Sequence, residues 1–118
     1  MLNKAFLIGR LVRDPEMRMT SSGISVTRFT IAVDRTFRRE EGGEKVTDFL
    51  RVVTWRRLAE ICGQYLKKGK LVAVEGRLQV DSYEKDGQKR QSAEVMADNV
   101  QMLDKLSSVP SEEASAGF

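Results

Sequence analysis

The chain of 118 residues contains no histidine and a single cysteine, Cys62. Without histidine there is no Ser-His-Asp triad, no histidine general base and no histidine metal ligand. One thiol excludes an intrachain disulfide and a metal site built from several thiolates. The carboxylates are scattered, and no pair of them lies beside a base or a set of metal ligands. The sequence therefore predicts a protein that is not an enzyme, with no catalytic residue, no metal and no cofactor.

Long apolar runs are also missing. No run approaches the roughly 18 apolar residues that span a bilayer. The N-terminus leads directly into a strand-like pattern, without the apolar core of a signal peptide. We therefore expect a cytoplasmic protein with no membrane partner. The length suits one domain, which we expect over residues 1–106, followed by a short disordered tail over 107–118 that has few apolar residues.

Basic residues are unevenly distributed along the chain. The net charge is +3, but all 20 basic residues and 15 of the 17 acidic residues lie before Leu106, so residues 1–106 carry +5. A mild basic excess is compatible with an ordinary solvated surface. It indicates a nucleic-acid ligand only where the basic residues lie beside accessible aromatic side chains.

Alternating apolar and polar residues predict five strands, over residues 2–13, 24–37, 47–55, 71–83 and about 91–103. A bulge is expected at Asp98-Asn99, and residues 18–20 could form a further short edge strand. Apolar residues at helical spacing from Leu58 to Leu66 predict a helix between the third and fourth strands. This order predicts an all-β OB-fold, a five-stranded Greek-key barrel with one helix. An SH3-like barrel and an open α+β sheet are the alternatives, and the helix position argues against the former.

The predicted strand over residues 47–55 carries the clearest functional signal. Phe49, Arg51 and Trp55 share one of its faces. Burying an unpaired guanidinium costs at least several kcal/mol, so we expect this face to be accessible. Large aromatics beside an arginine are typical of surfaces that stack bases and neutralise phosphates. The alternative is that the aromatics pack inside the protein, which is what we expect of Phe29 and Tyr65 on their apolar faces.

Phe37 and Tyr83 stand at the mouths of two polar hairpin loops, over residues 38–45 and 84–89, and could extend the same surface. Stacking accepts any base, so binding by such residues would be largely independent of sequence. The predicted stacking residues are Phe37, Phe49, Trp55 and Tyr83.

Several short segments, in this order and spacing, resemble the bacterial single-stranded DNA-binding protein (SSB) family. They are Asn3-Lys4, Ile8-Gly9-Arg10-Leu11, Asp14-Pro15-Glu16, Phe49-Leu50-Arg51-Val52-Val53, Leu58-Ala59-Glu60, Tyr65-Leu66-Lys67-Lys68-Gly69 and Val74-Glu75-Gly76-Arg77-Leu78. The resemblance runs from about residue 2 to residue 103. It implies an OB-fold homotetramer that coats and protects single-stranded DNA during replication, recombination and repair, in the nucleoid of the cytoplasm.

The resemblance also implies site residues. The family's stacking positions fall on the same four aromatics, although the family often has tryptophan where this chain has Phe or Tyr. Its phosphate-contacting positions fall on Arg35, Arg38, Arg51, Lys67, Lys68, Arg77 and Lys85. Family members usually end in an acidic tip that docks replication and repair proteins. The tail of this chain keeps two acids and the terminal aromatic of that tip: Glu112, Glu113 and Phe118.

A second class of function stays open at this point. The chain could be an OB-fold interaction module of a replication-restart or recombination assembly, in which contact with DNA is secondary to protein docking. Salt-dependent binding to poly-dT separates the two hypotheses, because phosphate contacts weaken as salt rises.

Overall fold

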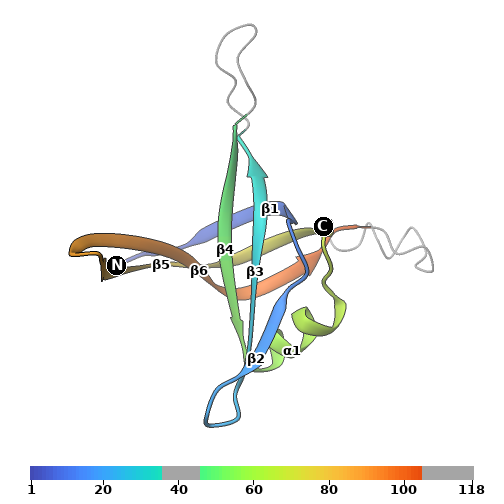
Figure 1. Cartoon of the computed structure of the whole chain (residues 1–118). Helices are drawn as coiled ribbons and strands as arrows, with labels where there is room; N and C mark the ends of the chain where they lie inside the picture. The colour runs from blue at the N-terminus through green and yellow to red at the C-terminus, as the bar shows by residue number, and fades with distance from the viewer. Residues whose placement is uncertain (36–45, 105–118) are drawn as a thin grey trace, which may run out of the picture.

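The computed structural model describes residues 1–35 and 46–104. Along the chain these residues form β1 (Ala5–Leu11), β2 (Glu16–Met19), β3 (Ser25–Asp34), β4 (Thr47–Trp55), α1 (Arg56–Tyr65), β5 (Leu71–Lys85) and β6 (Gln88–Met102) (Figure 1). Five of the predicted site residues lie outside the described residues: Phe37, Arg38, Glu112, Glu113 and Phe118.

The strands form one closed sheet. Their order is β1-β5-β6-β4-β3-β2, and β1 also pairs with β3, which closes a ring of five strands. All pairs are antiparallel except β4 with β6. The helix lies between the third and fourth strands of this ring, as predicted. The strand outside the ring, β2, pairs only with β3. It confirms the short edge strand that the sequence analysis gave as a possibility.

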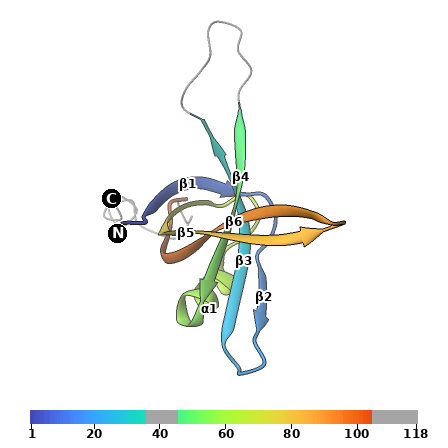
Figure 2. The same ribbon diagram turned by 90° about the vertical axis from the view of Figure 1, so that its left-hand side faces the viewer.

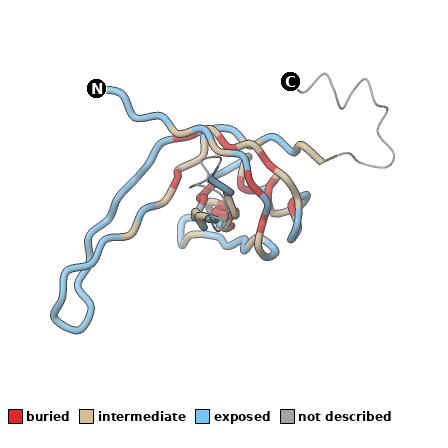
Figure 3. Tube along the Cα trace, turned by 90° about the horizontal axis from the view of Figure 1, so that it is seen from above, coloured by how far each residue is buried: buried red, intermediate tan, exposed pale blue. Residues whose placement is uncertain are grey.

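Alternation along the strands places the core inside the ring. Phe29 and Ile31 of β3 and Val52 of β4 are buried, and the helix adds Cys62 to the same cluster. Buried residues lie on the strands of the ring and on the helix, and not on the outer part of the β5–β6 hairpin (Figure 3). Burial raises the pKa of the Cys62 thiol to about 11, so this cysteine is protonated at neutral pH and acts as a packing residue.

Two buried threonines link α1 to β3 and β3 to β4. The Thr27 hydroxyl donates to the carbonyl of Ala59 on α1 over 2.6 Å, and the Thr54 hydroxyl donates to the carbonyl of Thr27 over 2.9 Å. Both side chains are fully buried, so these bonds satisfy polar groups that would otherwise destabilise the fold. Among the described residues, no helix is long and apolar enough to cross a membrane.

The β5–β6 hairpin projects from the ring as an exposed arm (Figures 2 and 3). Asp86 and Gly87 form its turn with positive φ angles of 54° and 76°, the backbone of a two-residue type I′ turn. The strands therefore continue to Lys85 and Gln88, and the predicted loop over residues 84–89 was too long. The predicted bulge is confirmed, because Asp98 is an extra residue between the partners of Glu75 and Gly76.

The prediction that Tyr65 packs inside the protein is wrong, since 53% of its surface is exposed. The helix ends at Tyr65, and Leu66 adopts an extended conformation as its C-cap. Leu66 rather than Tyr65 then enters the core, where it is 2% exposed. Phe29, for which the same prediction was made, is buried.

Candidate nucleic-acid interface

The outward side of β4 presents two aromatic side chains and an arginine. Phe49 is 66% exposed and Trp55 is 39% exposed, and Arg51 lies exposed between them. At about 3.3 Å per residue the two aromatics are roughly 20 Å apart along the strand. The prediction that this face of the strand is accessible is confirmed for these three residues.

Val53 shares that side of β4 but is only 1% exposed, so the accessible surface is interrupted between Arg51 and Trp55. In the sheet register Val53 stands beside Arg28 of β3 and Met96 of β6. Both neighbours have longer side chains than valine, so the low exposure of Val53 is consistent with its place between them. Alternation within one strand could not reveal this, since the neighbours of Val53 come from other strands.

The corner after β4 determines the position of Trp55. Arg56, the next residue, has a positive φ of 59°, which is uncommon for a residue other than glycine. The chain therefore turns sharply from β4 into α1. This turn leaves Trp55 at the end of the strand, where it is partly exposed.

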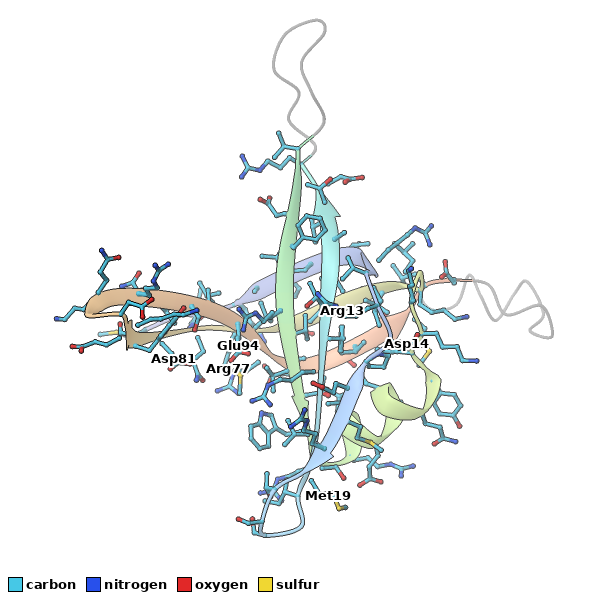
Figure 4. The ribbon with its side chains drawn as sticks, viewed as in Figure 1. Arg13, Asp14, Met19, Arg77, Asp81 and Glu94 are labelled. Carbon is cyan, nitrogen blue, oxygen red and sulfur yellow. The ribbon has the colours of Figure 1, made fainter. Side chains whose placement is uncertain are left out.

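The sheet register extends the surface from β4 to β5. Arg51 lies beside Glu94 of the parallel strand β6, and Glu94 lies beside Gln79 of β5. Neighbours in register point to the same side of a sheet. The side of β4 that presents Phe49 therefore continues into the side of β5 that presents alternate residues from Arg77 onward (Figure 4). We call this surface the aromatic face and define it by Phe49, Arg51, Trp55, Arg77, Tyr83 and Lys85.

Charges on the aromatic face are only loosely paired. The guanidinium of Arg77 lies 3.7 Å from the Asp98 carboxylate, and that of Arg28 lies 3.9 Å from Glu94. Ion pairs of this length at a surface contribute about 0–1 kcal/mol, so a phosphate can compete for either arginine. Tyr83, on the projecting arm, is 47% exposed and lies beside Arg90 of β6.

The structure does not bring Arg35 to the aromatic face. Its guanidinium donates two hydrogen bonds of 3.0 Å to the carboxylate of Asp48. Asp48 precedes Phe49 in β4, so the two side chains point to opposite sides. The hydrogen bond from Arg35 lowers the pKa of Asp48, which keeps the pair charged at neutral pH.

Lys67 and Lys68 lie in the turn between α1 and β5, away from the strands that form the aromatic face. Both are exposed. The backbone N–H of Lys68 donates to Oδ1 of Asp14 over 2.9 Å, which attaches this turn to the corner between β1 and β2. A surface that connects these two lysines with the aromatic face therefore has to pass the corner between β1 and β2.

Sequence reasoning missed Arg28 and Glu94 as members of this surface. Arg28 alternates with buried residues of β3, which gives it an outward position, but nothing in that pattern places it near Arg51 and Glu94. In residues 1–35 and 46–104 no group of acidic and cysteine side chains could hold a metal ion.

The sequence and the fold match those of known proteins. The model of the single-strand binding protein family matches residues 2–103. The single-stranded DNA-binding protein of Caldanaerobacter subterraneus subsp. tengcongensis is 49% identical over 119 residues, which cover 96% of this chain and 79% of that protein.

Two solved structures extend the match. A deletion mutant of the single-stranded DNA binding protein from Thermus aquaticus superposes with a TM-score of 0.75 at 38% identity, over 87% of this chain. The match covers 51% of that chain, so this chain spans about half of its length. Plasmodium falciparum SSB, in complex with ssDNA, superposes with a TM-score of 0.80 at 28% identity, over 88% of this chain and 96% of the other. The chain therefore belongs to the single-strand binding protein family.

Proposed function

We propose that this chain binds single-stranded DNA without sequence preference and protects it during replication, recombination and repair, without catalysing a reaction. The observation that carries the proposal is the exposure of Phe49 and Trp55 on either side of Arg51, on a face that continues onto β5. Family membership and the similarity to an SSB solved with ssDNA support it. The proposed stacking residues are Phe37, Phe49, Trp55 and Tyr83, and the proposed phosphate contacts are Arg35, Arg38, Arg51, Lys67, Lys68, Arg77 and Lys85. Of these, Arg35 lies away from the aromatic face, and a phosphate would have to displace the carboxylate of Asp48 from it.

Each aromatic ring would stack on one base and stabilise the complex by about 1–3 kcal/mol, whatever the base. Exposed arginines and lysines would neutralise phosphates and release counterions. Titration with poly-dT at several salt concentrations tests the proposal. We expect tight binding that weakens as salt rises. Weak binding that does not depend on salt would instead favour the interaction module, in which DNA contact is secondary.

The fluorescence of Trp55 is expected to fall on addition of oligo-dT, because a stacked base contacts its indole. Trp55 is the one tryptophan of the chain, so all tryptophan emission reports on this position. The measurement is emission intensity at saturating oligo-dT. Unchanged emission, with binding confirmed by a second method, would remove Trp55 from the stacking residues.

The proposal includes assembly into a homotetramer. Phe6 and Ile8 point outward from β1 and are 70% and 57% exposed, beside a hollow of about 300 Å³ that they share with Ala73 of β5. One edge of β1 pairs with β5, whereas only Arg10 and Leu11 pair with β3 on the other edge. An open strand edge next to exposed apolar side chains favours pairing with another copy of the chain.

Replacing Ile8 with aspartate is expected to reduce the native mass from that of a tetramer to that of a smaller species. The change puts a charge in an apolar contact, which is costly when the charge is desolvated. Native mass spectrometry measures the outcome, and Ser21→Asp, in the exposed turn before β3, adds the same charge elsewhere. A monomeric wild-type chain, or a tetramer unaffected by Ile8→Asp, would contradict this assignment.

The place of action that follows from this function is the nucleoid in the cytoplasm. Recruitment of replication and repair proteins through Glu112, Glu113 and Phe118 stays a prediction, since these residues lie outside the described part of the chain. Binding of such proteins to the whole chain and to a Phe118→Ala variant would test it.

A further inference from the structure

A cleft of about 580 Å³ opens where the corner between β1 and β2 meets β3 and β4. Its volume lies within the roughly 300–1,000 Å³ typical of sites for small ligands. Arginines from three parts of the chain line it: Arg13 from the corner, Arg28 from β3 and Arg51 from β4. Figure 4 shows Arg13 and Asp14 at this corner, beside the two strands. Of the three arginines, Arg51 is one of the residues that define the aromatic face, and Arg28 lies on the same side of the sheet, beside Val53.

The two carboxylates that also line the cleft are already engaged. Asp14 accepts the backbone N–H of Lys68 over 2.9 Å, and Glu16 lies 3.2 Å from the guanidinium of Arg18. The arginines are less committed. Within residues 1–35 and 46–104, neither Arg13 nor Arg51 forms an ion pair, and Arg28 lies 3.9 Å from Glu94. The cleft therefore presents positive charge that an anion can neutralise.

The cleft lies between two parts of the predicted site, the aromatic face and the turn that carries Lys67 and Lys68. At one end Arg51 belongs to the aromatic face. At the other end Asp14 holds the backbone of Lys68, so the turn that carries Lys67 and Lys68 adjoins the cleft. A single strand of DNA that continued from Arg51 of β4 through the cleft would reach the turn that carries both lysines.

We propose that this cleft is a nucleotide-binding subsite, in which Arg13 and Arg28 contact phosphates of the single strand between Arg51 and the Lys67–Lys68 turn. The proposal rests on the proposed function. It adds two phosphate contacts and a route for the DNA between Arg51 and the Lys67–Lys68 turn. Glu94 lies 3.9 Å from the guanidinium of Arg28, a loose pair in which a phosphate can replace the carboxylate.

The test measures binding of an oligo-dT of about 16 nucleotides, the upper end of the usual site size for one OB-fold, across a range of salt concentrations. We expect Arg13→Ala and Arg28→Ala each to weaken binding about two- to fivefold at low salt. Each variant should also reduce the slope of log K against log salt by about 0.7, the value for one lost phosphate contact on a single strand.

Two further variants separate phosphate contact from other effects. Arg28→Ala leaves the charge of Glu94 uncompensated, which would repel DNA by itself, so the double variant Arg28→Ala with Glu94→Gln removes both charges. We expect the double variant still to lose about 0.7 of slope, and Arg28→Lys to recover it. Lys4→Ala is the matched control, because Lys4 pairs with Glu75 at 2.9 Å and lines neither the cleft nor the aromatic face.

The outcomes distinguish this subsite from the function on which it rests. A wild-type chain that does not bind oligo-dT would overturn both proposals. Salt-dependent wild-type binding, with unchanged slopes in Arg13→Ala and in the double variant, would overturn the subsite alone. Because the side chain of Arg28 is 55% exposed, its replacement should leave the core intact, and thermal unfolding of each variant checks this.

Discussion

Replacing Phe49 with alanine is expected to weaken oligo-dT binding by about 1–3 kcal/mol, a loss of roughly 5- to 150-fold, because one stacking platform is removed. Phe49 is 66% exposed and stands beside Ala32 in the sheet. Truncating its ring therefore opens no cavity in the core, and the free energy of unfolding should change by about 0.5 kcal/mol or less. The loss should be similar for different base compositions, because stacking does not read base edges.

Quenching of Trp55 fluorescence by oligo-dT measures this loss, and urea denaturation measures the stability of the variant. Tyr65→Ala is the matched control. Tyr65 is also an exposed aromatic, at 53%, but it lies on α1 and not on the aromatic face. Wild-type affinity in Phe49→Ala would show that no base stacks there. If the variant unfolds while the Tyr65 variant does not, Phe49 supports the fold and its assigned role is wrong.

Much of the fold could be predicted because local pattern and sheet geometry agree. The alternation around Phe29 and Ile31 identifies the buried side of β3, and the change to helical spacing after Trp55 locates α1. The features that were predicted wrongly depend on where an element ends. Tyr65 fits the apolar stripe of the helix, but the helix stops there and Leu66 takes the core position. The spacing of apolar residues does not show at which residue a helix ends.

For the site, too, features within one strand could be predicted and contacts between distant segments could not. Arg51 identified the accessible side of β4 from one strand alone, since a buried unpaired guanidinium is unfavourable. Partners distant in sequence could not be predicted. Arg35 pairs with Asp48, 13 positions further along the chain, and Arg28 approaches Glu94 from another strand. The arginines of the cleft come together only because the corner between β1 and β2 folds against β3 and β4.

Replacing Gly76 with alanine is expected to lower the free energy of unfolding by at least about 1–3 kcal/mol, the range for an overpacked interior. Gly76 is buried and lies opposite the bulge at Asp98, where β6 comes close to β5. A Cβ at this position would overlap the backbone carbonyl oxygen of Met96 and come within 2.9 Å of Cα of Ala97. Both contacts are with backbone, which cannot rotate away as a side chain would. Urea denaturation monitored by circular dichroism measures the change.

Gly87 provides the comparison, because it lies in the same hairpin and needs glycine for a different reason. A Cβ on Gly87 meets no atom within 4 Å, but the residue has a φ of 76°, so Gly87→Ala carries only the cost of a left-handed backbone, about 1–2 kcal/mol. We expect the Gly87 variant to keep wild-type DNA affinity.

Gly76→Ala should also weaken binding, since a displaced β6 moves Glu94 and Met96, which lie beside Arg51 and Val53. A Gly76 variant as stable as wild type would show that the two strands do not approach closely at the bulge. In that case the register that continues the aromatic face from β4 to β5 would need another explanation.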